Sequence, residues 1–162
     1  MAVLHITAGD EMQKVMARPG EVWVPFSEAM LRGPRRADLF TEACITARAA
    51  FHGVTPEAYR AKFAPFLSAL ARPGEFSAVH LYFGNEDFCR ANTLAALSAL
   101  EQAGFSCPVT LTVMEEQTCT PIAAYALSPG GFMRLWAEAE DLFSPAVEQA
   151  LYGTPIDSDT NA

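Results

Sequence analysis

Short apolar runs alternate with segments of helical spacing along this chain, and this alternation restricts its fold more than any other feature. The apolar runs are too short for helices and are bounded by turn residues, as strands are. In the segments between them, apolar residues recur at every third or fourth position, as they do in helices packed on one side. The predicted strands are residues 3–7, 21–24, 80–83, 107–113 and, with a weaker pattern, 121–127.

Strands that alternate with helices pair in parallel through right-handed crossovers. We therefore expect a single α/β domain over residues 1–153, a three-layer sandwich with a mainly parallel sheet of four or five strands, Rossmann-like or flavodoxin-like. Its core would span residues 3–127 and its C-terminal helices residues 128–153, followed by a flexible tail at 154–162. An α+β fold in which the last one or two strands run antiparallel at an edge is the alternative.

Proline, glycine and capping residues predict where several helices begin and end. A helix over residues 37–53 would close on Gly53, and the next would start at Thr55 with Pro56 in its first turn. Pro65 should interrupt that second helix, because a proline inside a helix loses a backbone hydrogen bond and clashes with the preceding turn.

Four further residues have the sequence context of helix caps. Ser27 would cap a single helical turn after the second strand, and Asn85 would cap a long helix that ends at Gly104. Ser128 and Ser144, each followed by proline, predict the starts of two C-terminal helices.

Charge and cysteine usage exclude several classes of function. A formal net charge of -8 disfavours direct nucleic-acid binding, and no apolar run approaches the about 18 residues that a membrane span needs. The four cysteines form no CxxC pair, which argues against a zinc ribbon and favours buried thiols in a reducing compartment. The first residues lack the pattern of a secretory signal, so we expect a cytoplasmic protein.

Every predicted strand up to the fourth is followed by an acidic residue, at the edge of the sheet where open α/β folds bind ligands. One interpretation is structural, because carboxylates near helix N-termini interact favourably with the helix dipole. The other is a binding site formed by several loops. The polar residues that follow the four strands are Asp10 and Glu11; Ser27 and Glu28; Asn85, Glu86 and Asp87; and Glu115 and Glu116.

If these carboxylates converge, a positively charged group should sit among them. A divalent cation such as Mg²⁺ is one candidate, with Asp10 and Asp87 as its ligands, and a cationic or hydroxyl-rich small molecule is another. Neither GxGxxG nor GxxxxGK[ST] occurs, so a phosphate would need the metal, Arg32 or Arg90 to offset the acids. Arg90 could instead pair with Glu86 one helical turn away.

Signals for nucleophilic catalysis are weak. No GxSxG motif occurs, and Cys89 lies in a first helical turn beside acids that oppose thiolate formation. His5 and His80 alternate with apolar neighbours inside strands, as buried or edge histidines do, and Asn92 should be an exposed helix residue. The C-terminal aromatic and methionine residues could pack in the core, cover a sheet face or form a dimer contact. These residues are Phe132, Met133, Trp136 and Phe143.

Three segments, in this order, resemble the uncharacterised bacterial family called domain of unknown function 1835. They are "LHITAGD" (4–10), "PFSEAMLRGP" (25–34) and "LYFGNEDFCRANTLAALSAL" (81–100), within a resemblance that covers residues 3–113. The resemblance supports the α/β architecture and implies no reaction. Glu28 stands where the family pattern has aspartate, and Arg32 stands where an acid is usual. The residues carried over are Asp10, Glu28, Gly33, Pro34, Glu86 and Asp87.

Three functional hypotheses follow. The first is a cytoplasmic small-ligand-binding or regulatory domain with a polar site formed by Asp10, Glu28, Asn85, Glu86 and Asp87. The second is a small metal-dependent enzyme that acts on a phosphorylated or nucleotide substrate. The third is a protein-interaction module that forms a homodimer through its C-terminal aromatic residues. None of the three includes a membrane or nucleic-acid partner.

Overall fold

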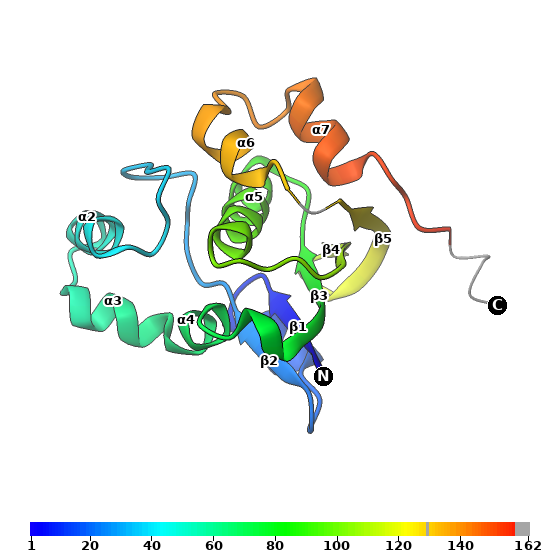
Figure 1. Ribbon diagram of the computed structural model, residues 1–162, viewed down its shortest axis with the longest axis horizontal. Helices are drawn as coiled ribbons and strands as arrows, with labels where there is room; N and C mark the ends of the chain where they lie inside the picture. The colour runs from blue at the N-terminus through cyan, green and yellow to red at the C-terminus, as the bar shows by residue number, and fades with distance from the viewer. Residues whose placement is uncertain (129, 158–162) are drawn as a thin grey trace.

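A five-stranded sheet with the order β2-β1-β3-β4-β5 forms the centre of the computed structural model, which describes residues 1–128 and 130–157 (Figure 1). The first four strands are parallel, and β5 runs antiparallel to β4 at one edge. This arrangement confirms the predicted α/β fold with a mainly parallel sheet. The strands are β1 (Ala2–Thr7), β2 (Val22–Pro25), β3 (Phe76–Phe83), β4 (Val109–Glu115) and β5 (Thr120–Leu127).

Helices connect the parallel strands and follow β5. One helix joins β1 to β2, three join β2 to β3, one joins β3 to β4, and two follow the last strand. No helix of the described segments is both long and apolar enough to cross a membrane. The helices are α1 (Asp10–Met16), α2 (Glu42–His52), α3 (Pro56–Lys62), α4 (Ala64–Leu70), α5 (Asp87–Gln102), α6 (Phe132–Glu138) and α7 (Pro145–Tyr152), with a 3₁₀ turn η1 (Pro73–Glu75) before β3.

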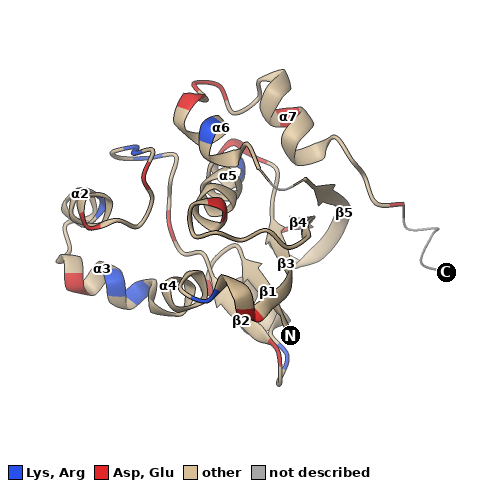
Figure 2. Ribbon diagram, viewed as in Figure 1, with Lys and Arg blue, Asp and Glu red and all other residues tan. Residues whose placement is uncertain are grey.

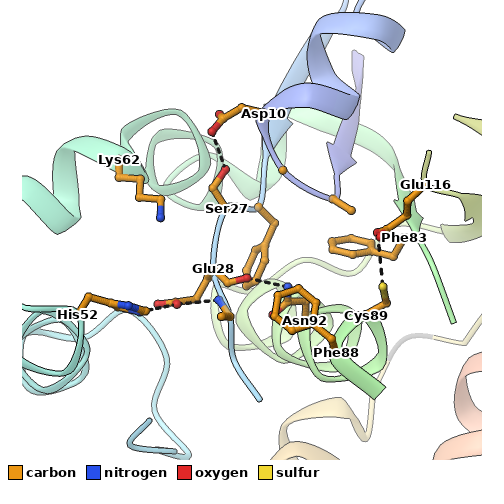
Figure 3. A pocket seen from close by; sticks show the side chains of 14 residues that line it. Asp10, Ser27, Glu28, His52, Lys62, Phe83, Phe88, Cys89, Asn92 and Glu116 are labelled. Carbon is orange, nitrogen blue, oxygen red and sulfur yellow. Dashed lines mark hydrogen bonds and ion pairs between the residues drawn. The ribbon is translucent and has the colours of Figure 1, made fainter. Parts of the chain in front are cut away.

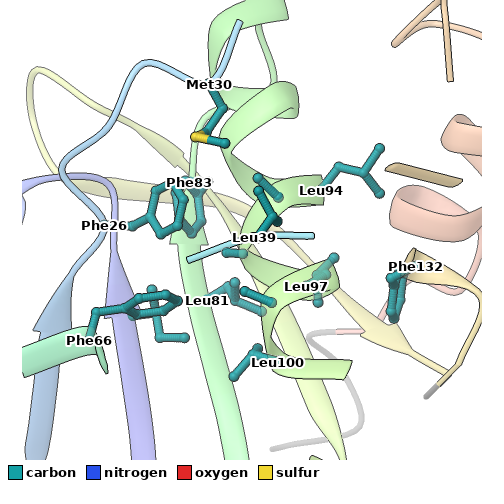
Figure 4. Close-up of a cluster of buried hydrophobic side chains, with 14 of the residues drawn as sticks. Phe26, Met30, Leu39, Phe66, Leu81, Phe83, Leu94, Leu97, Leu100 and Phe132 are labelled. Atoms are coloured by element: carbon teal, nitrogen blue, oxygen red, sulfur yellow. The ribbon is translucent and has the colours of Figure 1, made fainter. Parts of the chain in front are cut away.

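The strand order places helices on both faces of the sheet. The chain moves from β1 to β2 in one direction and from β3 to β4 in the other, so right-handed crossovers put α1 and α5 on opposite faces. Leu81 and Phe83 of β3 face the core beside α5 (Figure 4). Tyr82 between them faces the side of α1 together with His5. The sheet therefore lies between two layers of helix.

Helix α5 is the most buried element of the described chain. Leu94, Leu97 and Leu100 are all buried, and α6 packs against α5, so the helix is covered on more than the side that faces the sheet (Figures 1 and 4). Phe132 and Trp136 of α6 belong to the same hydrophobic cluster as these leucines. Buried polar side chains usually find partners within the protein, and Asn92 and Thr93 of this helix do, whereas the buried Ser98 hydroxyl has none among the described residues.

Several predicted helix ends are confirmed. The Thr55 hydroxyl accepts a hydrogen bond from the Ala58 amide at 3.1 Å, and Ser144 caps α7 in the same way. Gly53 ends α2 in the left-handed conformation with φ 68°. Pro65 lies in the first turn of α4, and the predicted interruption occurs just before it, where α3 gives way to α4. Proline, glycine and hydroxyl caps thus act here through local backbone geometry alone.

Three predicted caps are wrong. No helix follows Ser27, whose hydroxyl bonds to Asp10 instead. Asn85 precedes α5 but does not cap it, since Glu86 occupies the N-cap position without a side-chain bond. Ser128 is also displaced, because α6 begins later, with Gly131 at its N-cap in the left-handed conformation.

The predicted start of α2 and the predicted flexible tail also differ from the structure. Helix α2 begins after Thr41, whose hydroxyl accepts from the Cys44 amide, rather than at residue 37. Residues 154–156 lie along the outer edge of β5, where the Ile156 amide donates to the Ala124 carbonyl at 2.8 Å. This short pairing covers backbone groups that an edge strand would otherwise expose. The rest of the predicted tail, residues 158–162, lies outside the described residues.

Candidate functional site

A cavity of about 380 Å³ opens at the carboxyl ends of the parallel strands. Its walls come from the ends of β1 and β3 and from the loop after β2, with contributions from α2, α3 and α5 (Figure 3). The chain leaves β1 and β3 in opposite directions, and a crevice outside the carboxyl ends of such a strand pair is the usual ligand site of open α/β sheets. The predicted location of the site at this edge therefore coincides with a real cavity.

Two glycines shape the strand ends beside the cavity. Gly9 leaves β1 with φ 86° and ψ 175°, a conformation that a residue with a side chain rarely adopts, and this turn sets the start of α1 at Asp10. Gly84 follows β3, and a Cβ atom there would lie 2.9 Å from the Cys89 sulfur. The missing side chain lets the first turn of α5 approach the strand end closely.

Glu28 has a buried carboxylate that belongs to the framework of the site. Arg48 donates to it from Nη2 at 2.9 Å, the Tyr59 hydroxyl donates at 2.6 Å and the Ala29 amide donates at 2.7 Å. Burial alone would raise the pKa of Glu28, but the hydrogen bonds from Arg48, Tyr59 and the Ala29 amide outweigh it and lower the pKa to about 2. Glu28 is therefore ionised and its charge is balanced by Arg48.

Asn92 fixes the loop after β2 to helix α5. Its side-chain oxygen accepts from the Met30 amide at 2.9 Å, and its side-chain nitrogen donates to the Glu28 carbonyl at 2.7 Å. A buried amide that satisfies two backbone groups of a loop holds that loop in one conformation. This role corrects the expectation that Asn92 is an exposed helix residue, since only 4% of it is accessible.

His52 and Lys62 form one side of the cavity (Figure 3). His52 Nε2 lies 2.7 Å from Glu28 Oε1, and 30% of its side chain is exposed. Lys62 stands in the last turn of α3, which has one other basic residue, Arg60 (Figure 2). Figure 3 shows the Lys62 ammonium directed toward the cavity. No described residue forms an ion pair with this ammonium.

Asp10 and Ser27 form another part of the wall. The Ser27 hydroxyl donates to Asp10 Oδ2 at 3.2 Å, and the other Asp10 oxygen accepts no hydrogen bond from any described residue. Both side chains are close to solvent. This pair offers unused acceptor lone pairs to a molecule in the cavity.

Cys89 and Glu116 meet on the far wall. The Cys89 thiol donates to Glu116 Oε1 at 3.4 Å, and burial together with this carboxylate raises the pKa of Cys89 to about 12. A thiol with so high a pKa is a poor nucleophile at neutral pH. The expectation that Cys89 has no reactive role agrees with this environment.

The structure places the predicted polar residues of this edge in three locations. Asp10 and Glu28 line the cavity, whereas Asn85 and Glu86 line a separate hollow of about 260 Å³ between α5 and the β4–β5 turn. Asp87 is exposed in the first turn of α5 and lines neither space. The helix start therefore turns these three residues away from the strand-end cavity.

The proposed metal ligands are among the separated residues. Asp10 lines the cavity without Asp87, and within residues 1–128 and 130–157 no group of three or more His, Cys, Asp or Glu side chains could hold a metal ion. A cation at Asp10 would therefore need most of its ligands from water or from a bound molecule.

The two predicted arginines also lie away from the cavity. Arg32 is exposed in the loop after β2, and its carbonyl accepts from Arg48. Arg90 is buried against α7, where it pairs with Glu148 and lies over the Phe143 ring at 4.0 Å from the centroid. It fastens the C-terminal helix to α5 instead of pairing with Glu86.

The C-terminal aromatic residues divide between core and surface. Phe132 and Trp136 are buried in the hydrophobic core, and the Trp136 ring nitrogen donates to the Arg36 carbonyl at 2.7 Å. Met133 and Phe143 are partly exposed, and Arg90 covers the Phe143 ring. Most of the apolar surface that the dimer hypothesis requires is thus covered by contacts within the chain.

Sequence reasoning missed His52, Lys62 and Phe88. Lys62 and His52 come from helices that show no local sign of a site, and only the packing of α2 and α3 against the strand ends brings them there. Asn92 did carry a signal, because it is a polar residue inside an otherwise apolar stretch of helix. Such a residue in a buried helix indicates a specific hydrogen-bond partner.

Comparison with known proteins adds no assignment to this geometry. No protein-family model, no curated protein and no solved structure matches the chain.

Proposed function

We propose that the chain is a small-ligand-binding or regulatory domain whose ligand occupies the cavity at the carboxyl ends of β1 and β3. The observation that carries the proposal is the position of this cavity, which lies where the strand order reverses between β1 and β3. Its wall also has charged side chains that form no ion pair with another described residue. A cytoplasmic location is part of the proposal. All four cysteines are free, which suits a reducing compartment.

Apolar and polar walls together make the cavity suitable for an organic molecule. Phe26 and Phe83 are buried beside it, and Phe88 lies at its rim with 44% of its surface exposed. A ligand that covered the Phe88 ring would remove apolar surface from water, while Asp10 and Lys62 would orient its polar groups.

The framework of the cavity is rigid before any ligand binds. Glu28 and Asn92 attach the loop after β2 to α2, α3 and α5 through hydrogen bonds that are mostly buried. A preformed site loses little conformational entropy on binding, so even a small ligand can bind with useful affinity.

Thermal denaturation with a panel of amino acids, nucleotides, sugars, sugar phosphates and organic acids tests the proposal. We expect at least one compound to raise the melting temperature and to show saturable binding by calorimetry. Phe88→Ala should weaken that binding about tenfold, since partial burial of a phenylalanine ring contributes about 1–2 kcal/mol. The matched control is Phe143→Ala, because Phe143 is also 44% exposed and contacts Arg90, which does not line the cavity.

Two results would contradict the proposal. One is the absence of saturable binding across the panel. The other is a compound whose affinity is the same for the wild type and for Phe88→Ala, because that compound would bind elsewhere.

A further inference from the structure

The cavity has a positive group and a negative group that form no ion pair within the described chain, although Lys14 interacts with the negative group electrostatically from a greater distance. Glu28 is balanced by Arg48. Glu116 keeps its charge, because a neutral thiol is no counter-ion, but it lies beside Cys89 on the wall that Figure 3 shows across from Lys62. Lys62 and Asp10 remain, and they do not pair with each other. Their charges are available to a bound molecule.

The Asp10 side of the wall fits an ammonium group. Asp10 keeps one oxygen free, and Ser27, which donates its only hydroxyl proton to Asp10, keeps its lone pairs. A ligand group with several N–H donors could bond to both residues at once, whereas an anion would be repelled by Asp10. This side therefore favours an amino group.

The Lys62 side of the wall fits an anion. The ammonium reaches the cavity from the end of α3, and two neighbouring polar side chains on α2 and the β2 loop, His52 and Glu28, are bonded to each other (Figure 3). A carboxylate in the ligand would complete the hydrogen bonds of Lys62 with a charge-assisted contact.

Three phenylalanine rings form an apolar part of the wall, which fits the side chain of such a ligand. Phe26 and Phe83 face the cavity from the strand ends, and Phe88 covers it from α5. We propose that the cavity binds a zwitterionic amino acid with a large apolar side chain, its ammonium on Asp10 and Ser27, its carboxylate on Lys62 and its side chain against the phenylalanine rings. This inference rests on the proposed function and names its ligand class.

Calorimetric titration of the full chain at pH 7 with L-leucine and three related phenyl compounds tests the inference. L-phenylalanine carries both charged groups, 2-phenylethylamine lacks the carboxylate and 3-phenylpropanoate lacks the ammonium. We expect saturable binding of L-phenylalanine or of L-leucine, and at least tenfold weaker binding of both truncated compounds, because a hydrogen bond to a charged group is lost in each.

Two charge variants test which residue binds the carboxylate of the ligand and which binds its ammonium group. Lys62→Met should weaken L-phenylalanine binding at least tenfold and leave 2-phenylethylamine unchanged, whereas Asp10→Asn should weaken both compounds. Arg134→Met and Glu57→Gln are the matched controls, since both residues are exposed and neither lines the cavity. Circular dichroism at the titration temperature checks that each variant is folded.

The outcomes separate this inference from the proposed function. If neither amino acid binds, but another compound of the panel binds in a manner that Phe88→Ala weakens, the ligand class is wrong and the cavity is still a binding site. If a truncated compound binds as tightly as L-phenylalanine, or if Lys62→Met leaves the affinity of L-phenylalanine unchanged, the zwitterion assignment is overturned. If nothing in either experiment binds, both proposals fail.

Discussion

Glu28→Gln offers the sharpest test of the physical reasoning, because this carboxylate supports the whole wall of the cavity. The side chain is 1% exposed and accepts hydrogen bonds from Arg48, Tyr59 and the Ala29 amide. Glutamine has nearly the same shape but no charge, so the variant would leave Arg48, which is fully buried, without a counter-ion. Removing one partner of a buried ion pair costs about 3–5 kcal/mol.

The pH dependence of the free energy of unfolding gives an independent magnitude for the contribution of the Glu28 carboxylate. The hydrogen bonds to Glu28 lower its pKa from the ordinary value of 4.5 to about 2. At about 1.4 kcal/mol for each pKa unit, this difference corresponds to about 3 kcal/mol of stability. Because the folded pKa lies below the unfolded pKa, that contribution is complete above about pH 5.5 and is lost as the pH falls toward 2.

Urea denaturation followed by circular dichroism, repeated between pH 7 and pH 2.5, measures both effects. We expect Glu28→Gln to unfold with about 3 kcal/mol less free energy than the wild type at pH 7, and the difference should shrink as the pH falls. The exposed Glu57→Gln is the matched control and should change the free energy of unfolding by less than about 0.5 kcal/mol. A cost below 1 kcal/mol at pH 7, or a difference that stays constant down to pH 2.5, would refute the reasoning.

Three other perturbations probe contacts outside the Glu28 cluster. Cys89 should remain unmodified when the native protein meets iodoacetamide at pH 8, since burial and a neighbouring carboxylate raise the pKa of its thiol to about 12; labelled Cys89 peptides in the mass spectrum would contradict this. Arg90→Met should lower the free energy of unfolding by about 1–3 kcal/mol and speed amide hydrogen exchange in α7, because the ion pair with Glu148 and the aromatic contacts are lost; unchanged exchange in α7 would show that apolar packing alone holds it. Gly33→Ala should cost about 1–2 kcal/mol, because Gly33 has φ 81° and the added Cβ would lie 2.6 Å from the Phe51 ring; a melting temperature equal to that of the wild type would rule this out.

Helix α5 and the residues before it show which features of the site the local sequence pattern could predict and which it could not. The strand before it, the helix itself and the edge of the sheet that carries ligands could all be predicted from residues 80–104. Most of the side chains predicted to form the site at that edge do not line the cavity. Asn85, Glu86 and Asp87 follow β3, but the path of the chain into α5 turns them toward a different hollow or toward solvent.

Glu28 illustrates the same limit. Its position after β2 indicated the right edge, but its partners come from residues 20 and 31 positions later in the chain. Partners so distant in sequence leave no pattern near Glu28 itself. The local sequence therefore cannot distinguish a free ligand-binding carboxylate from one in a buried ion pair, and only the packing of α2 and α3 decides between them.

The sequence by itself determined the type and order of most elements, because strand alternation, proline and glycine positions and hydroxyl caps act over a few neighbouring residues. Only the tertiary structure decided that β5 runs antiparallel, that residues 154–156 pair with its edge, and that His52, Lys62 and Asn92 belong to the cavity. The physical reason is range: backbone conformation depends on local sterics, whereas the environment of a charge depends on which distant helices pack against it.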